Sequence, residues 1–289
     1  MAEASRAAVH RVDEHVARDG TRLHVAIDAP ADARAGVVIH HGFAEHGGRY
    51  DEVVARLNAA GVATLRFDAR GHGRSTGRRG HVDHFSQYLT DLAEMLDVAR
   101  DALPRPLALL GHSQGGLVAL RYLLDAPGAV DGLIVSNPAL VVRAAVPGWK
   151  KVAGRVFSRA WPTLAVPTGL PPDSISRDPA EVAAYADDPL IFKVGSARWY
   201  TEFVDAQQAV LAAPGRLRTA PLLGLLGMGD PLIDATASDR FLQGVAADPV
   251  TVHRYDGLYH ELFREIRADR ERVFADLLGW LGALQADGR

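Results

Sequence analysis

The chain has 289 residues, which is enough for one large domain or two small ones. Hydrophobic residues make up 48% of it, so a sizeable core can form, and a net charge of −3 gives no reason to expect nucleic acid as a partner. The sequence contains no cysteine, which excludes disulfides, thiolate metal sites and a cysteine nucleophile.

No targeting or membrane signal is evident. Residues 1–6 lack the apolar core of a signal peptide, and no run of about 18 uncharged apolar residues occurs. We therefore expect a soluble, cytoplasmic protein.

Strand and helix patterns alternate along most of the chain. Residues 9–27 are typical of two strands joined at Asp19-Gly20, a strong hairpin signal. Further strands are expected at 36–40, 62–67, 106–110, 132–136, 221–226 and 250–255, and helices at 49–60, 86–103, 117–124, 237–245 and 269–284. Because several strands are apolar on both faces, the pattern predicts a mostly parallel sheet with helices on both faces. In such sheets a site lies at the carboxyl ends of the strands.

The alternation stops after Asn137-Pro138 and resumes at Pro221. The intervening residues 139–218 are too many for a connecting loop, contain several prolines and have helical patterns of their own. We expect a core formed by residues 1–138 and 219–289, with residues 139–218 inserted as a cap over the site.

Two G-x-S-x-G pentapeptides occur, around Ser75 and around Ser113. Residues 111–115 lie between an apolar strand and an apolar helix, the context of the nucleophile elbow of an α/β-hydrolase. Residues 73–77 lie in a glycine-rich segment that no strand enters directly and no apolar helix follows. We therefore expect Ser113 to be the nucleophile and Ser75 to lie in a surface loop.

A serine nucleophile needs an imidazole base, and in this fold the acid and then the base follow the serine along the chain. Only His253 and His260 follow Ser113. His253 falls inside the last strand pattern, whereas His260 lies beyond it on a loop that can reach back over the sheet. We therefore expect His260 to be the base.

Three aspartates are candidates for the acid that orients His260. Asp230 comes directly after the strand at 221–226 and is favoured by its place. Asp234 is the second candidate, and Asp256 lies too near His260 in sequence to reach beneath it easily.

An oxyanion hole needs two preorganised N–H donors. In this fold they are the amide after the nucleophile, here Gln114, and an amide in the loop after the strand at 36–40, here Phe43. The histidine spacings match no metal-binding motif, and the glycine-rich loops match no nucleotide-binding motif, so we expect neither a metal nor a nucleotide.

These residues resemble the monoacylglycerol lipase and lysophospholipase family of α/β-hydrolases. The stretch H-G-x-x-E-H-x-x-R-Y at residues 41–50 is the most specific, and the other matching stretches are 68–75, 111–116, 227–230 and 259–261. The resemblance implies the triad Ser113, Asp230 and His260, and the oxyanion donors Phe43 and Gln114. It also implies that Glu45 and Arg49 are polar groups near the head-group end of the site. Gln114 stands where methionine is common in the family.

The function predicted from these features is a serine carboxylester hydrolase that needs no cofactor. It would cleave monoacylglycerols to glycerol and fatty acid through an acyl-enzyme. The alternatives are a lysophospholipase or a broad short-chain carboxylesterase and, less favoured, an acyltransferase or a receptor-like binder with slow turnover.

The expected cap carries a distinctive charge pattern. Residues 132–172 include five basic residues and no acidic one. Around Trp149 the apolar residues share one helical face, while Lys150, Lys151, Arg155 and Arg159 lie away from it. A basic amphipathic helix of this kind suits peripheral contact with a membrane or micelle. The alternative is that its apolar face packs on the catalytic core.

Overall fold

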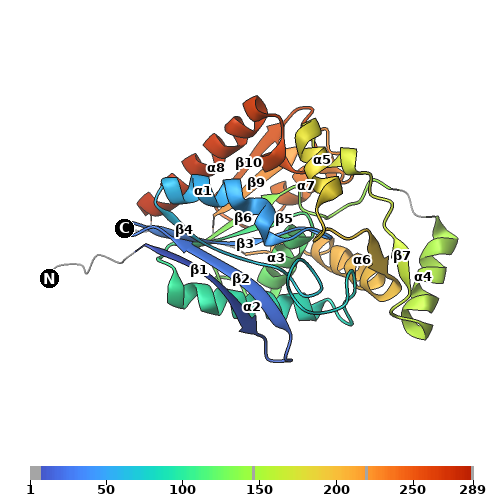
Figure 1. Cartoon of the computed structure of the whole chain (residues 1–289). Helices are drawn as coiled ribbons and strands as arrows, with labels where there is room; N and C mark the ends of the chain where they lie inside the picture. Colours follow the sequence, from blue (N-terminus) through green and yellow to red (C-terminus); the bar gives the residue numbers. More distant parts are fainter. Residues whose placement is uncertain (1–7, 145–146, 219–220, 288–289) are drawn as a thin grey trace.

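The computed structural model describes residues 8–144, 147–218 and 221–287. Within these ranges eight strands form a central sheet: β1 (Val9–Val16), β2 (Arg22–Ala29), β3 (Ala35–His40), β4 (Val62–Phe67), β5 (Leu107–His112), β6 (Gly132–Ser136), β9 (Leu222–Gly227) and β10 (Val250–Tyr255). Their order is β1-β2-β4-β3-β5-β6-β9-β10 (Figure 1). β2 pairs antiparallel with β1 and β4, and the six strands from β4 to β10 pair in parallel. The mostly parallel sheet predicted from the sequence is confirmed.

Helices cover both faces of this sheet, as predicted (Figure 1). One face packs against α1 (Asp51–Ala59) and α8 (Arg267–Asp287), and the other against α2 (Ser86–Ala102), α3 (Gln114–Asp125) and α7 (Ala235–Gln243). Successive side chains of a strand point to opposite faces. Leu110 accordingly joins the cluster beneath α1 and α8, and its neighbour Leu109 joins the cluster beneath α2 and α3.

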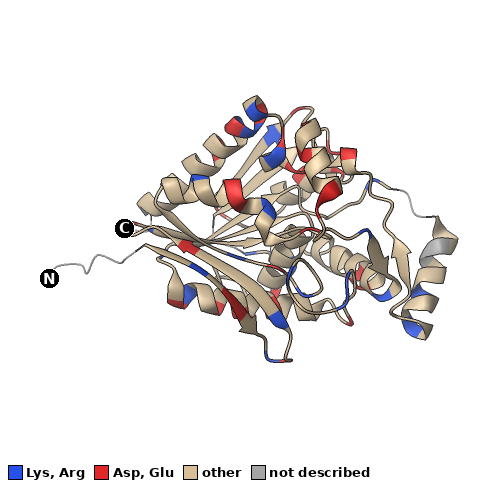
Figure 2. Ribbon diagram, in the orientation of Figure 1, with Lys and Arg blue, Asp and Glu red and all other residues tan. Residues whose placement is uncertain are grey.

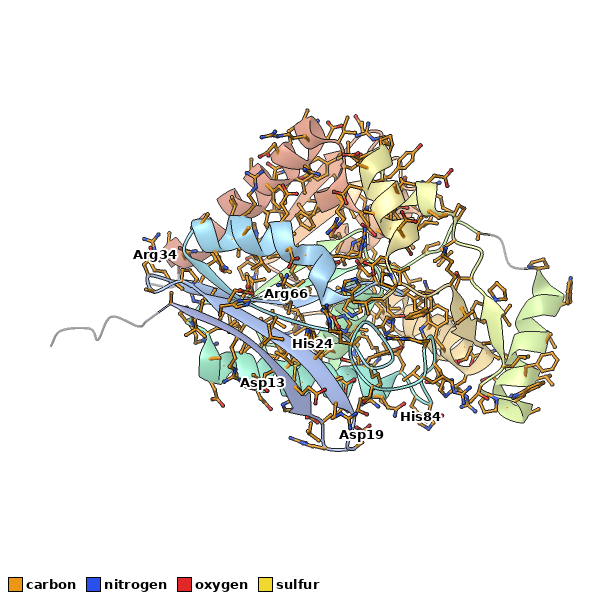
Figure 3. All side chains as sticks on the ribbon, viewed as in Figure 1. Asp13, Asp19, His24, Arg34, Arg66 and His84 are labelled. Carbon is orange, nitrogen blue, oxygen red and sulfur yellow. The ribbon has the colours of Figure 1, made fainter. Side chains whose placement is uncertain are left out.

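The hairpin at the chain's start also forms as predicted. β1 and β2 pair from Val9↔Ala29 to Val16↔Arg22, and Asp19 lies at the tip of the turn (Figure 3). Its carboxylate accepts a hydrogen bond from the amide of Thr21 at 3.0 Å. The turn thus satisfies one of its own exposed donors, as aspartate side chains commonly do in turns.

The segment from 139 to 218 contributes its own elements: α4 (Gly148–Ala160), β7 (Ala165–Pro167), α5 (Pro179–Asp187), β8 (Val194–Ser196) and α6 (Ala197–Leu211). β7 and β8 form a small antiparallel pair apart from the central sheet. α6 is different, because Phe203, Ala206 and Val210 belong to the same buried cluster as α2 and α3. The segment is therefore anchored to the body of the protein through α6, while α4 lies at the periphery (Figure 1).

Four short 3₁₀ helices complete these ranges: η1 (Gly47–Tyr50), η2 (Pro172–Ser174), η3 (Pro214–Arg216) and η4 (Leu262–Arg264). None of the helices in the described ranges has both the length and the apolar content to cross a bilayer.

Ser75 lies in a loop, as expected, and residues 77–79 of that loop are exposed, but Ser75 itself is not on the surface. Its side chain is buried, because its hydroxyl donates to the carbonyl of Asp68 at 2.5 Å and accepts the amide of His24 at 2.8 Å. The contact with His24 has no signal in the sequence, because His24 is on β2 and 51 residues from Ser75 along the chain. Ser75 therefore fastens the loop after β4 to the sheet.

A buried ion pair holds the same loop to α2. The Nε and Nη2 atoms of Arg70 each donate to one carboxylate oxygen of Asp91 at 2.6 Å, and the Asp91 side chain is 1% exposed. Removal of Asp91 would leave the buried Arg70 guanidinium paired with the exposed Asp19, 2.8 Å from its Nη1 atom, and would cost the buried, bidentate part of its compensation.

We predict that Asp91→Ala lowers the free energy of unfolding by about 3 kcal/mol, because Arg70 loses its bidentate partner. Denaturant unfolding measures this change. Asp125→Ala is the matched control: its pair with Arg121 is exposed, and its loss is expected to change stability by less than about 1 kcal/mol. Equal effects of the two substitutions would contradict the structural role of Asp91.

Candidate active site

Ser113 occupies the sharp turn between β5 and α3. Its φ of 50° and ψ of −116° place it in a backbone region that residues other than glycine rarely adopt. The turn is fixed by hydrogen bonds on both sides, because Ser113 N–H donates to Ser136 O at 3.0 Å and Ser113 O accepts from Ala139 N at 2.9 Å. The serine side chain therefore stands at the carboxyl end of the sheet and at the N-terminus of α3.

The glycines of this pentapeptide are needed because backbones meet there. A Cβ atom added to Gly115 would lie 2.1 Å from the carbonyl oxygen of His40 and 2.6 Å from that of His41. One added to Gly111 would lie 2.6 Å from Gly115 O. Since the obstructing atoms are backbone, a larger residue at either position would push α3 away from β3 and β5.

The structure brings Ser113, His260 and Asp230 together in one chain of hydrogen bonds. His260 Nε2 lies 2.9 Å from Ser113 Oγ, and His260 Nδ1 lies 2.6 Å from Asp230 Oδ2. The other carboxylate oxygen, Asp230 Oδ1, accepts the amides of Leu232 at 2.7 Å and Ile233 at 3.0 Å. All three residues are buried or nearly so. An arrangement of this kind can remove the serine proton during attack on a carbonyl.

The pair His260–Asp230 shifts the proton affinity of both groups. Burial raises the pKa of Asp230, but the positive charge and hydrogen bond of His260 and the two amides outweigh it, so this pKa lies below its ordinary value. Burial lowers the pKa of His260, but the charge and hydrogen bond of Asp230 outweigh burial and raise this pKa above 6.5. The geometry therefore favours an ionised aspartate that stabilises the imidazolium.

The other candidates from the sequence lie elsewhere. Asp234 caps the N-terminus of α7, where its side chain accepts the amide of Ala237 at 3.1 Å. His253 lies on β10 with its Nδ1 atom 3.4 Å from Asp276. Neither of them is hydrogen-bonded to Ser113 or His260 in the described part of the chain.

The oxyanion hole remains a prediction, and the segments expected to supply its two amides lie next to Ser113. Gln114 is the first residue of α3, so its N–H has no acceptor within the helix and sits at the positive end of the helix dipole. Gly42, which precedes Phe43, lies against the nucleophile, because a Cβ atom added to it would be 3.1 Å from Ser113 Cβ. The loop that carries Phe43 is thus in place to supply a second donor.

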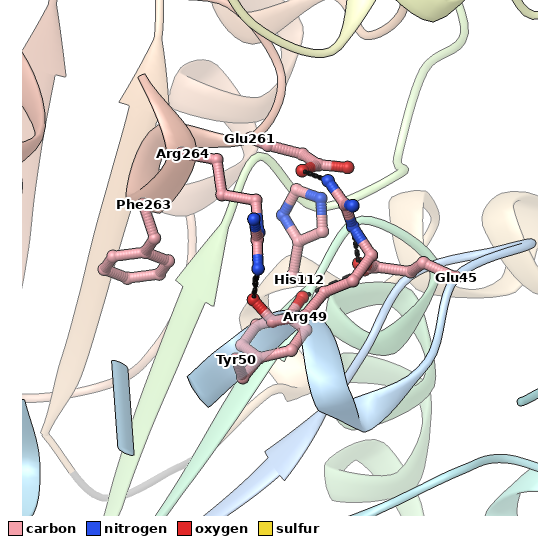
Figure 4. A pocket seen from close by; sticks show the side chains of 7 residues that line it. All are labelled: Glu45, Arg49, Tyr50, His112, Glu261, Phe263 and Arg264. Carbon is pink, nitrogen blue, oxygen red and sulfur yellow. Dashed lines mark hydrogen bonds and ion pairs between the residues drawn. The ribbon is translucent and has the colours of Figure 1, made fainter. Parts of the chain in front are cut away.

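Glu45 and Arg49 are turned toward buried partners, among them Glu261, the residue after His260 (Figure 4). Arg49 bridges two carboxylates, with Nη2 2.5 Å from Glu261 Oε2 and Nε 3.4 Å from Glu45 Oε2. Glu45 Oε1 also accepts the amide of Gly42 at 2.5 Å and the hydroxyl of Tyr50 at 3.0 Å. Contact of Glu45 or Arg49 with a substrate head group remains a prediction, since each already has protein partners.

A small cavity of about 20 Å³ lies among these side chains, which is room for about one water molecule. It is lined by Glu45, Arg49, Tyr50, His112, Glu261, Phe263 and Arg264 (Figure 4). Arg264 donates to the backbone carbonyl of Arg49 at 2.9 and 2.5 Å and pairs with Glu181. Both guanidinium groups that line the cavity are therefore engaged by the protein.

No cluster of three or more histidine, aspartate or glutamate side chains is arranged for a metal ion among residues 8–144, 147–218 and 221–287.

Two residues with a clear place at the site were not identified from the sequence. Asn137 Nδ2 donates to the carbonyls of Tyr259 at 3.0 Å and His260 at 2.8 Å, and its Oδ1 accepts the amide of Gly227 at 2.8 Å. Its position at the carboxyl end of β6 was a usable signal, because functional groups gather at such ends. Arg143 Nε donates to the carbonyl of Asp230 at 2.8 Å, a contact without any signal in the sequence.

The chain is similar to known proteins over most of its length. A family model described as serine aminopeptidase, S33, matches residues 31–267. Over 268 residues the chain is 34% identical to a monoacylglycerol lipase of Mycolicibacterium smegmatis, covering 91% of this chain and 93% of that protein. It is 32% identical over 241 residues to phospholipase YtpA of Bacillus subtilis, covering 83% and 92%. The crystal structure of a Paleococcus ferrophilus monoacylglycerol lipase superposes with a TM-score of 0.82 at 29% identity, covering 91% and 99%.

The raised pKa of His260 yields a prediction about pH dependence. A protonated imidazole cannot accept the serine proton, so kcat/KM is expected to fall as the pH drops through an apparent pKa above 6.5. Asp230→Asn removes the charge that raises this pKa. The acid limb should therefore move to lower pH, and kcat should fall about 10⁴-fold.

A pH profile of ester hydrolysis measures both effects. Asp234→Asn is the matched control, because it changes a nearby aspartate that caps α7, and it is expected to keep the wild-type limb. An acid limb that stays in place in Asp230→Asn would contradict the assigned pair.

Proposed function

Because the chain belongs to the serine aminopeptidase S33 family of hydrolases, we propose that it is a serine ester hydrolase acting on monoacylglycerols. The observation that carries this proposal is the continuous path from Ser113 Oγ through His260 to Asp230, with distances of 2.9 and 2.6 Å. Similarity to monoacylglycerol lipases over most of the chain supports the substrate class.

Acylation would begin at the ester carbonyl. Ser113 Oγ attacks the carbonyl carbon while His260 Nε2 takes its proton, and the amides of Phe43 and Gln114 hold the oxyanion. The tetrahedral intermediate collapses as the bond to glycerol breaks, and His260 gives its proton to the departing glycerol oxygen. The fatty acyl group remains on Ser113 as an ester.

Deacylation would repeat these steps with water. His260 takes a proton from the water that attacks the acyl-enzyme, and then returns a proton to Ser113 Oγ as the fatty acid leaves. Asp230 keeps the imidazole oriented and stabilises its charged form in both halves of the reaction. The sequence of steps requires no cofactor.

A neutral head group fits the charges around the site better than a phosphate does. Arg49 is held between Glu45 and Glu261, and Arg264 is paired with Glu181 and with backbone oxygen. A phosphate would have to displace a buried carboxylate to bind Arg49, and the half-buried Glu181 to bind Arg264, whereas glycerol hydroxyls carry no charge to neutralise. This argument favours monoacylglycerol over lysophospholipid.

We also propose that residues 139–218 form the cap, and that α4 is its contact with lipid. The apolar face of α4 does not pack on the catalytic core: Trp149, Val152 and Val156 are 69, 65 and 58% exposed. Figure 2 shows basic but no acidic residues on α4. Arg155 is engaged with Asp205 at 3.1 Å, and the side chains of Lys150 and Lys151 lie outside the described part of the chain. A basic helix with exposed aromatic and aliphatic residues suits an anionic lipid surface.

A substrate panel tests the proposed reaction. We expect kcat/KM to be higher on monoacylglycerols than on lysophospholipids that carry the same acyl chain, with free fatty acid and glycerol as products. Ser113→Ala should abolish turnover and labelling by a fluorophosphonate, because no other group forms the acyl-enzyme. Product analysis with an added alcohol separates hydrolysis from acyl transfer.

Ser75→Ala is the control for the serine of the second pentapeptide. It should keep hydrolysis while losing about 2 kcal/mol of stability, because it removes a buried hydroxyl that makes two hydrogen bonds. Turnover in Ser113→Ala would refute the nucleophile. A preference for lysophospholipid would refute the substrate, and a burst of product without steady turnover would favour a slow binder.

The contact with lipid can be tested at exposed positions of α4. The double substitution Val152→Asp and Val156→Asp replaces apolar groups with charges repelled by anionic lipid. It is expected to weaken sedimentation with phosphatidylglycerol vesicles at least about tenfold, since each buried valine is worth about 1.5 kcal/mol. Activity on vesicle-borne monoacylglycerol should fall relative to activity on a dissolved p-nitrophenyl ester.

Val12→Asp and Val16→Asp on β1 form the matched control. These valines are also exposed, but they lie on β1, at the edge of the central sheet and away from α4 (Figure 1). Equal vesicle binding by the two double variants would rule out α4 as the contact with lipid.

A further inference from the structure

One side chain of α6 touches both residues assigned to the oxyanion hole. Trp199 Nε1 donates a hydrogen bond to Gln114 Oε1 at 2.9 Å. The Trp199 ring also stacks on the ring of Phe43, with centroids 3.8 Å apart and planes inclined by 25°. The backbone amides of these two partners are the proposed oxyanion donors, so Trp199 joins both halves of the hole through their side chains.

The start of α6 is built to hold Trp199 in this place. Ser196 caps the helix, and its hydroxyl accepts the amide of Trp199 at 3.0 Å and meets His81 Nδ1 at 2.8 Å. Gly195 leaves room for the stacked rings, because a Cβ atom added there would lie 2.9 Å from Trp199 Cε3 and 3.6 Å from Phe43 Cζ. Trp199 is thus held in place by the hydrogen bond of its backbone amide to Ser196 as well as by the contacts of its ring.

Three further contacts join residues 188–192 to the loop that carries Phe43, called here the oxyanion loop. The amide of Phe192 donates to the carbonyl of Ala44 at 3.3 Å, and His46 Nε2 lies 2.8 Å from Asp188 Oδ2. The ring of Phe192 meets that of Phe43 edge-on, with centroids 5.3 Å apart. Residues 188–199 therefore contact residues 43–46 at several points. Of the contacting residues named here, Trp199 also binds Gln114.

We infer that Trp199 is a positioning residue that holds the amides of Phe43 and Gln114 at the spacing the oxyanion requires. This inference rests on the proposed ester hydrolysis. An oxyanion hole is effective only when its donors are fixed before charge develops, and small displacements of reacting groups have large effects on rate. Because Trp199 acts in the transition state through other residues, its loss should lower kcat and leave KM nearly unchanged.

Substitutions at both ends of the hydrogen bond test the inference. With p-nitrophenyl butyrate, we expect Trp199→Phe to lower kcat about fivefold, because the ring still stacks but the hydrogen bond is lost. Trp199→Leu loses the hydrogen bond and the stacking, and its kcat should fall about fiftyfold, somewhat less than removal of a whole oxyanion donor. KM should stay within about twofold in both, since the ground state does not use the hole.

Gln114→Met removes the acceptor and keeps the backbone amide. If Trp199 acts through Gln114, the double variant Trp199→Phe, Gln114→Met should have the kcat of the slower single variant, because both changes break one contact. Additive losses, or a kcat of Trp199→Leu within about twofold of wild type, would overturn the inference. If Trp199→Leu does not fold, the inference is tested by Trp199→Phe, Gln114→Met and the double variant alone.

Trp280→Phe is the matched control, since Trp280 is also half-buried but lies on α8 beside Gly132. It is expected to keep wild-type kcat and KM. A wild-type protein without ester hydrolysis, or turnover in Ser113→Ala, would refute the proposed function and the inference with it. Active wild type, inactive Ser113→Ala and unaffected Trp199 variants would refute the inference alone.

Discussion

Ser113 holds a left-handed backbone conformation that costs about 1–3 kcal/mol in isolation, and the close approach of α3 to β3 keeps it there. Gly115 can lie against the carbonyls of His40 and His41 only because it has no Cβ atom. That contact fixes the axis of α3 and therefore the direction of the Gln114 amide at its N-terminus. The position of the nucleophile and of one oxyanion donor thus follow from a single packing contact between backbones.

The second constraint is the buried charge beside the triad. Arg49 joins Glu45, which accepts the amide of Gly42, to Glu261, the residue after His260. Buried ion pairs contribute little to net stability because desolvation offsets their attraction. They do specify geometry, since moving either carboxylate removes one of the two partners of the buried guanidinium. Arg49 therefore ties the oxyanion loop to the histidine loop, two segments more than 200 residues apart.

The sequence predicted the features that have a local cause. Strands and helices follow from periodicity, and the meeting of Ser113, Asp230 and His260 was expected because each follows a strand of a parallel sheet. Features caused by contacts between distant segments were not predicted: Ser75 proved buried rather than exposed, and its hydroxyl accepts a hydrogen bond from the amide of His24 on β2. The exposed apolar face of α4 could not be distinguished from a packed one, since the same helical spacing serves both.

The helix that carries this exposed face, α4, is linked to the proposed oxyanion hole through α6. α4 leans on α6 through the hydroxyls of Ser158 and Thr201, 2.7 Å apart, and through a hydrogen bond at 3.1 Å from Arg198 Nε to the carbonyl of Ser158. Arg198 is followed directly by Trp199, which stacks on Phe43 and binds Gln114. Docking of α4 on lipid would change its position relative to α6. Such a change would therefore act on the same turn of α6 that contacts the residues of the proposed oxyanion hole. In this arrangement the surface that would collect the substrate and the groups that would stabilise its transition state both contact one helix, α6, so a displacement of the first turn of α6 would affect both.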